Sequence, residues 1–227
     1  MALNMVERID GMVKVRRVLA SVSDKSGLDL LVAGLLEVNP SMMIYSTGGT
    51  YEAIRGMLGA DRSARNLTSV SDYTGQPEMQ GGLVKTLDFK IYLGLLSETY
   101  NPAHVQDLAR VGAVPMDMVV VNLYPFAATV AKAGVTPEAA RTNIDIGGPC
   151  MIRAAAKNYL RTASVTDPAD YAGLVKTLRS NGGALPLARR FELMKKAFAH
   201  TAAYDAAIAA YFAARTDAEV EHCYQIV

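Results

Sequence analysis

Cysteine and histidine are scarce in this 227-residue sequence, which has two of the former and three of the latter. Cys150 and Cys223 cannot form a disulfide framework, and no metal-binding spacing joins them to the histidines. This usage is typical of a reducing cytosol, so we expect a cytoplasmic protein. The sequence also lacks the apolar runs of a signal peptide or a membrane span.

Net charge is also close to zero, at +1, which argues against nucleic acid or an anionic membrane as the main partner. Apolar residues make up 51% of the chain and charged residues 20%, as in ordinary globular domains. No internal repeat or linker divides the sequence. We predict one α/β domain at 15–213 with a helical C-terminal portion, after an N-terminal extension (1–14) and before a C-terminal tail (214–227).

Hydrophobic patterning predicts alternating strands and helices. Strands are expected at 15–22, 42–45, 66–70, 117–123 and 162–165, and helices at 28–38, 50–58, 150–156, 168–178 and 187–213. This alternation predicts parallel βαβ units with ligand sites at the carboxyl ends of the strands. The β-branched run at 117–123 is typical of a strand covered on both faces. The polar, turn-rich stretch 71–100 is predicted as a long loop, a class that is usually functional or disordered.

Two short polar loops follow the first two predicted strands. Hydroxyls, backbone N–H groups and an ammonium at the start of a helix together form a phosphate site. The candidate phosphate-binding residues are Ser23, Lys25, Thr47, Gly48, Gly49 and Thr50. Either loop alone is a weak signal, because most Gly-Gly pairs are merely turns, whereas two at one end of a parallel sheet strengthen the case for a phosphorylated ligand. Neither is the Gly-Lys-Ser/Thr loop of an ATPase.

The stretch 143–158, NIDIGGPCMIRAAAKN, places a carboxylate before a glycine turn and an amine at the end of a helix. Pro149 fits the first helical turn. Asp145 and Lys157 are therefore candidate site residues, although Asp145 could simply cap the turn. Lys85 and Lys157 could be solvated, and Tyr124 could be a packing residue. The residues alone indicate a phosphate-binding α/β enzyme with lysine and aspartate in its cleft.

Eight motifs, in order, resemble the IMP cyclohydrolase domain of the bifunctional enzyme that ends de novo purine synthesis. They are SVSDKSG (21–27), STGGT (46–50), VSDYTGQPEM (70–79), VKTL (84–87), VVVNLYPF (119–126), NIDIGGP (143–149), RAAAKN (153–158) and KAFAHTAAYD (196–205). The resemblance covers residues 15–212. The transformylase half of that enzyme is absent from this sequence, which predicts a free-standing cyclohydrolase.

The resemblance implies a methylglyoxal-synthase-like fold, a homodimer, and no cofactor or metal. It implies a hydrolase-class reaction in which formamidoimidazole-carboxamide ribonucleotide (FAICAR) closes to IMP with loss of water. Lys157 would be the proton donor or acceptor, with Asp145 as its partner at the reacting amide. Lys85 and Tyr124 would be supporting polar groups around the base of the nucleotide. The remaining implied substrate contacts are Thr86, Asn122 and the backbone near Ile146, beside the two phosphate loops.

A helix over 150–157 would be roughly 12 Å long at 1.5 Å per residue, which separates Asp145 from Lys157 unless the glycine turn folds back. The sequence also departs from the family at three nearby positions. Leu83 replaces an arginine, and Asp88 and Tyr92 stand where histidines are usual. Our hypothesis is that Lys90 or Arg153 supplies the missing cation.

Two other functions remain open. A phosphate-eliminating lyase of the methylglyoxal synthase type would share the phosphate loops but would not need IDIGGP, RAAAKN or HTAAYD. A degenerate domain that binds purine nucleotides, as a sensor or as a partner subunit of a separate AICAR transformylase, is favoured by Leu83. Asp145, Lys157 and Lys85 oppose that alternative.

Overall fold

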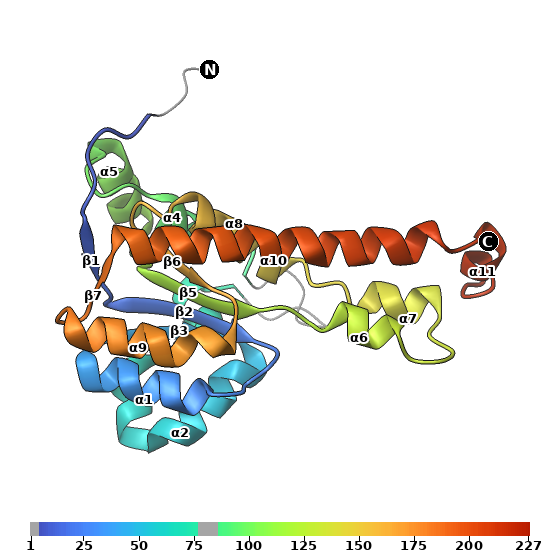
Figure 1. Ribbon diagram of the computed structural model, residues 1–227, viewed down its shortest axis with the longest axis horizontal. Helices are drawn as coiled ribbons and strands as arrows, with labels where there is room; N and C mark the ends of the chain where they lie inside the picture. Colours follow the sequence, from blue (N-terminus) through green and yellow to red (C-terminus); the bar gives the residue numbers. More distant parts are fainter. Residues whose placement is uncertain (1–4, 77–85) are drawn as a thin grey trace.

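A computed structural model describes residues 5–76 and 86–227. At its centre lies a five-stranded sheet in the order β4-β3-β2-β5-β6 (Figure 1). The strands are β2 (Arg17–Val22), β3 (Met43–Ser46), β4 (Leu67–Ser69), β5 (Met118–Asn122) and β6 (Ala163–Val165). Every neighbouring pair is parallel. The predicted α/β fold with a parallel sheet is confirmed.

Helices cover both faces of this sheet (Figure 1). One face packs against α1 (Leu28–Val38), α2 (Gly48–Asn66) and α9 (Tyr171–Ser180), and the other against α4 (Phe89–Leu96), α8 (Gly147–Lys157) and α10 (Leu187–Ala213). Met118 and Val120 of β5 belong to the first core, and Val119 and Val121 to the second. A strand buried on both faces has no polar side, which explains the continuous apolar run.

The stretch 71–100 is not the long loop that the sequence predicted. Its described residues contain part of α3 (Val70–Thr74) and all of α4. Asp88 begins α4 by accepting a hydrogen bond from the Lys90 N–H at 2.7 Å, and Ile91 and Leu95 are fully buried. The helix is only eight residues long, so its periodicity was too short to stand out beside the turn-rich segment before it.

Other boundaries differ where apolar periodicity is weak. Helix α1 has the predicted bounds, as does α10. Helix α2 runs past the predicted end at residue 58, through a break at Gly59, where φ is 69°. The helix predicted from 168 begins as a 3₁₀ turn, η2 (Pro168–Asp170). The short helices α5 (Pro102–Val111), α6 (Phe126–Val130), α7 (Pro137–Thr142) and α11 (Asp217–Glu221) were not predicted.

The predicted N-terminal extension takes part in the fold, where the Asp10 and Gly11 carbonyls accept hydrogen bonds from Arg190. Strand β1 (Met12–Lys14) pairs antiparallel with β7 (Ala184–Pro186), just before α10. Along the described chain, no helix is long and apolar enough to cross a membrane.

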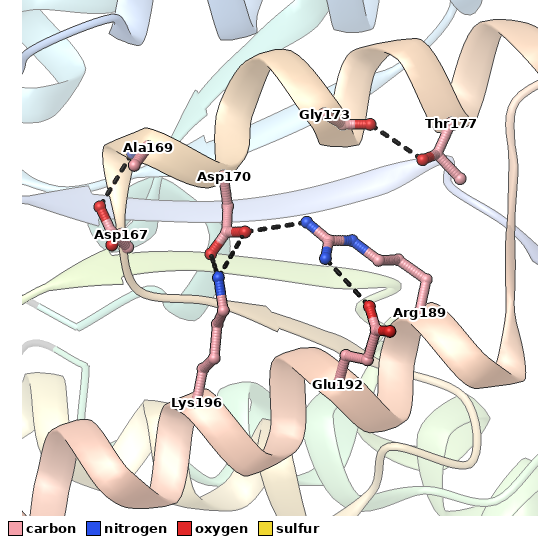
Figure 2. Close-up of polar contacts among 8 residues, drawn as sticks. All are labelled: Asp167, Ala169, Asp170, Gly173, Thr177, Arg189, Glu192 and Lys196. Carbon is pink, nitrogen blue, oxygen red and sulfur yellow. Dashed lines mark hydrogen bonds and ion pairs between the residues drawn. The ribbon is translucent and has the colours of Figure 1, made fainter.

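A buried aspartate, Asp170, joins the start of α9 to two cations of α10 (Figure 2). Asp170 accepts hydrogen bonds from Lys196 at 2.8 and 2.9 Å and from Arg189 at 2.9 Å. Burial raises the pKa of the Asp170 carboxyl, but the hydrogen bonds from the two cations outweigh it, so the pKa lies below its usual range. Because this anchor lies in the first half of α10, the second half can project beyond the sheet, where it contacts α6 (Figure 1).

Candidate active site

A cavity of about 480 Å³ opens at the carboxyl ends of β2, β3 and β5. This is the edge at which parallel sheets bind their ligands. All of the predicted site residues line it except Lys85, which lies outside the described residues, and Lys157. Those that line it are Ser23, Lys25, Thr47, Gly48, Gly49, Thr50, Thr86, Asn122, Tyr124, Asp145 and Ile146.

The loop after β3 presents the start of a helix to the cavity. Helix α2 begins at Gly48, whose φ of 43° favours glycine. The first N–H groups of a helix have no partner within it and attract anions. A side-chain carbon on Gly49 would lie 3.9 Å from the Lys25 ammonium, so the cation lies close to this helix start. Together they form a site suited to a phosphate.

Thr50 has a structural role that the sequence did not reveal. Its hydroxyl accepts the N–H of Val22 at 2.9 Å and donates to the carbonyl of the same residue at 3.0 Å. Ser21 and Thr47 join their hydroxyls at 2.9 Å. These bonds lock the first turn of α2 onto the end of β2, so Thr50 holds in place the loop that was predicted to bind phosphate.

Asn122 acts in a similar way on the other loop. Its side-chain amide accepts the N–H of Asp24 at 2.8 Å and donates to the carbonyl of Asp24 at 2.8 Å. Asn122 was predicted to contact the base. In this conformation both ends of its amide instead hold the loop that carries Ser23 and Lys25.

Asp145 is half-buried in the turn before α8. Its carboxylate accepts the Gly148 N–H at 2.8 Å. Burial raises the pKa of this carboxyl, against the opposing effect of the Gly148 and Tyr124 backbone N–H groups. The side chain therefore caps the turn and also lines the cavity, so the cap does not remove Asp145 as a candidate site residue.

The paired glycines are needed because other groups approach them closely. A side-chain carbon on Gly147 would collide with the Thr86 hydroxyl, and one on Gly148 would lie 2.6 Å from both Asp145 and Leu123. These separations are too short for any side chain. Because these two residues are glycines, Thr86 can lie against Gly147 and Asp145 against Gly148 where both line the cavity.

Lys157 lies apart from Asp145. Helix α8 begins at Gly147 and has 11 residues, which gives a length of roughly 15 Å. Lys157 is exposed at its far end and is not among the described residues that line the cavity. The helix is longer than predicted, so the expected meeting of the two side chains on one substrate does not occur within a single chain.

Of the three positions that depart from the family, the structure describes Asp88 and Tyr92. Leu83 lies outside the described residues. Asp88 caps α4, and Tyr92 packs against the core, where burial and Cys150 raise the pKa of its hydroxyl.

The two candidate replacement cations point elsewhere. Lys90 donates to the Tyr73 carbonyl at 3.3 Å, and Arg153 lies over the Phe198 ring at 5.5 Å. Neither is among the described residues that line the cavity. Because Leu83 lies outside the described residues, the hypothesis that one of them replaces the missing arginine stays a prediction. Lys25 is the cation that the described residues place there.

The chain is similar to known proteins over most of its length. Residues 30–150 match the family model of the MGS-like domain, and residues 155–226 match that of the AICARFT/IMPCHase bienzyme. The chain is 49% identical over 203 residues to the bifunctional purine biosynthesis protein PurH of Magnetococcus marinus, with 89% of this chain and 37% of the relative covered. It is 43% identical over 201 residues to PurH of Leptospira biflexa, with 88% and 38% covered.

The chain thus spans little more than a third of the length of these relatives. The crystal structure of ForH superposes with a TM-score of 0.70 at 33% identity, and the match covers 88% of this chain and 99% of ForH. The fold, the order of the motifs and these matches agree, and the chain belongs to the AICARFT/IMPCHase family, with an MGS-like domain as its core.

Proposed function

We propose that this chain is an IMP cyclohydrolase, which closes FAICAR to IMP with loss of water as the last step of purine biosynthesis in the cytoplasm. The observation that carries the proposal is the convergence of two phosphate-type loops and a half-buried Asp145 on one cavity of about 480 Å³. That volume is within the usual range for small-molecule sites. Its relatives named as purine biosynthesis proteins support the same conclusion.

The proposed chemistry is a condensation within one molecule. The carboxamide nitrogen attacks the formyl carbon, and a new C–N bond forms. The carboxamide and formamide nitrogens each lose one proton, and the formyl oxygen leaves as water. No oxidation state changes in this balance, so no redox cofactor is proposed.

In this scheme Lys25 and the first N–H groups of α2 hold the 5′-phosphate, with Ser23 and Thr47 nearby. Asp145 accepts the proton of the carboxamide nitrogen as the new bond forms. Tyr124 and Thr86 lie at the same cavity and supply hydroxyls around the base. Lys85 is proposed as a further supporting group on the basis of its motif alone.

The direct test is to mix the pure protein with FAICAR and to follow IMP formation by absorbance. Turnover above the uncatalysed rate supports the proposal. Absence of turnover together with tight IMP binding would favour the second candidate, a nucleotide sensor or a partner subunit of a separate AICAR transformylase. Leu83 in place of the family arginine is the observation that favours this alternative.

We expect IMP to raise the thermal midpoint of the protein much more than inosine does. A ligand at 100 times its Kd stabilises the native state by about 2.7 kcal/mol, and inosine cannot use the Lys25 site because it has no phosphate. Differential scanning fluorimetry with both ligands measures this. Equal shifts would remove the phosphate-site assignment.

Lys157 keeps its proposed role as proton donor or acceptor only if it serves a second copy of the chain. The cavity of its own chain lies at the other end of α8. We therefore propose a homodimer in which Lys157 of one copy reaches the cavity of the other. The second half of α10 is suited to close packing because most of its exposed residues are small. Besides Asp205 they are Ala199, Ala202, Ala203, Ala206, Ala209, Ala210 and Ala213.

We therefore expect Lys157→Ala to bind IMP as the parent does, within about 2-fold, while its turnover falls. The role in a second copy is checked by mixing and reassociating the Lys157→Ala and Asp145→Asn variants. If the subunits exchange at random, about half of the dimers are mixed, and each mixed dimer has one site with both Asp145 and Lys157 intact. About a quarter of the parental sites should therefore be restored. Unchanged turnover in Lys157→Ala would remove the residue from the mechanism.

A further inference from the structure

Tyr204 contacts the backbone of the Asp145 turn from the second half of α10. Its hydroxyl accepts the N–H of Asp145 at 2.8 Å and donates to the carbonyl of Asn143 at 3.4 Å. One side chain therefore holds the turn on both sides of Ile144. The two bonds bridge about 60 positions of sequence, so they fix the turn to a different element of the fold.

The Tyr204 ring is itself held in place. Phe126, 1% exposed, presents its ring edge-on to Tyr204 at 6.3 Å between centroids and to Tyr211 at 5.9 Å. Tyr204 also packs against the second core cluster. An aromatic side chain with so few free rotations is a rigid support. The phenol oxygen is therefore fixed before the turn binds to it.

The turn has few other supports. No side-chain cap binds the start of α8 at its N-cap, Ile146, in the described structure. Ile146 is 58% exposed, so its side chain adds little packing. The Asp145 N–H donates to Tyr204, and its carboxylate accepts the Gly148 N–H at 2.8 Å and the backbone N–H of Tyr124. Loss of the bond to Tyr204 releases the backbone of the turn and leaves Asp145 held only through its carboxylate.

We propose that Tyr204 is a positioning residue, which sets the place of the Asp145 carboxylate in the cavity without touching the substrate. This inference rests on the proposed function for its catalytic consequence, but the hydrogen bond itself can be tested separately. It also gives a physical reason for the HTAAYD motif, whose tyrosine does not line the cavity among the described residues.

The test is Tyr204→Phe, which keeps the ring and its contact with Phe126 and removes only the hydroxyl. We expect kcat to fall roughly 10-fold, because small displacements of a catalytic group are costly, with the Kd of IMP changed by less than about 2-fold. Hydrogen exchange of peptides covering 143–148, followed by mass spectrometry, should become faster as the turn opens locally.

Tyr211→Phe is the matched control. Tyr211 lies on the same helix, packs on the same Phe126 ring and donates its hydroxyl to the Val135 carbonyl at 3.3 Å. It does not contact the Asp145 turn in the described structure, so kcat and exchange at 143–148 should stay at parental values. Thermal midpoints of both variants show whether a change in kcat is merely a loss of stability.

Parental kcat and parental exchange in Tyr204→Phe would overturn the inference, as would equal losses of kcat in both variants. If the parent itself shows no turnover of FAICAR, the proposed function fails. The exchange measurement then still decides the matter: faster exchange at 143–148 in Tyr204→Phe alone supports the positioning role, and unchanged exchange refutes it.

Discussion

Changing Asp145→Asn is expected to lower the turnover of FAICAR by about 10²-fold or more, the usual scale for a positioned proton-transfer group. Asparagine keeps the size of the side chain, and its amide oxygen can still accept the Gly148 N–H. What is lost is the negative charge that accepts the proton. IMP binding should weaken much less, because the phosphate loops are unchanged. Steady-state kinetics and IMP titration of the same preparation separate the two effects.

The pH dependence gives an independent check on Asp145. Burial raises the pKa of this carboxyl, and its protonated form cannot accept the amide proton. Parental turnover should therefore fall on acidification with a midpoint above the ordinary aspartate value of about 3.9. In Asp145→Asn, this acidic fall in the plot of turnover against pH should be absent.

Asp107→Asn serves as the control, because Asp107 forms a surface ion pair with Arg110 on α5. It should change neither turnover nor the pH profile. Near-parental turnover in Asp145→Asn would leave the residue only its capping role, and the proton acceptor would have to be sought elsewhere.

Local patterns were enough to predict the sheet and the loops at its carboxyl edge. The apolar run at 117–123 predicted a strand buried on both faces, and β5 is such a strand. The hydroxyl-glycine loops follow β2 and β3 directly, so parallel pairing brings Lys25 and Gly49 together. In each case the relevant residues are close in sequence, and the rule for parallel sheets supplies the remaining geometry.

The roles of individual polar groups could not be predicted in this way. Thr50 and Asn122 were expected to bind the ligand, yet Thr50 bonds to the end of β2, 28 positions away, and Asn122 to the following loop, 98 positions away. Such pairings depend on the register between strands, which the sequence pattern leaves open. Lys157 is the clearest case, since its motif implied a shared site with Asp145 that the length of α8 prevents within one chain.

Replacing Arg190 is expected to cost more stability than any other single charge in the described fold, because its guanidinium holds three chain segments together. The side chain is 1% exposed. It donates to the carbonyls of Tyr159 at 3.0 Å and Leu160 at 2.9 Å, to that of Leu185 at 2.5 Å, and to those of Asp10 at 2.7 Å and Gly11 at 3.5 Å. These carbonyls flank α8, β7 and β1.

Arg190→Met keeps an unbranched apolar chain of similar reach but leaves the buried Leu185 carbonyl and four part-buried carbonyls without their donor. Breaking a buried charged network by removing one partner typically costs about 3–5 kcal/mol, and orphaned acceptors contribute most of that. Urea denaturation should show this as a lower midpoint at an unchanged m-value. Arg179→Met, which removes an exposed ion pair with Glu37, should cost less than about 1 kcal/mol. Equal small losses in the two variants would mean that water replaces the guanidinium and that the pairing of β1 with β7 is stable without it.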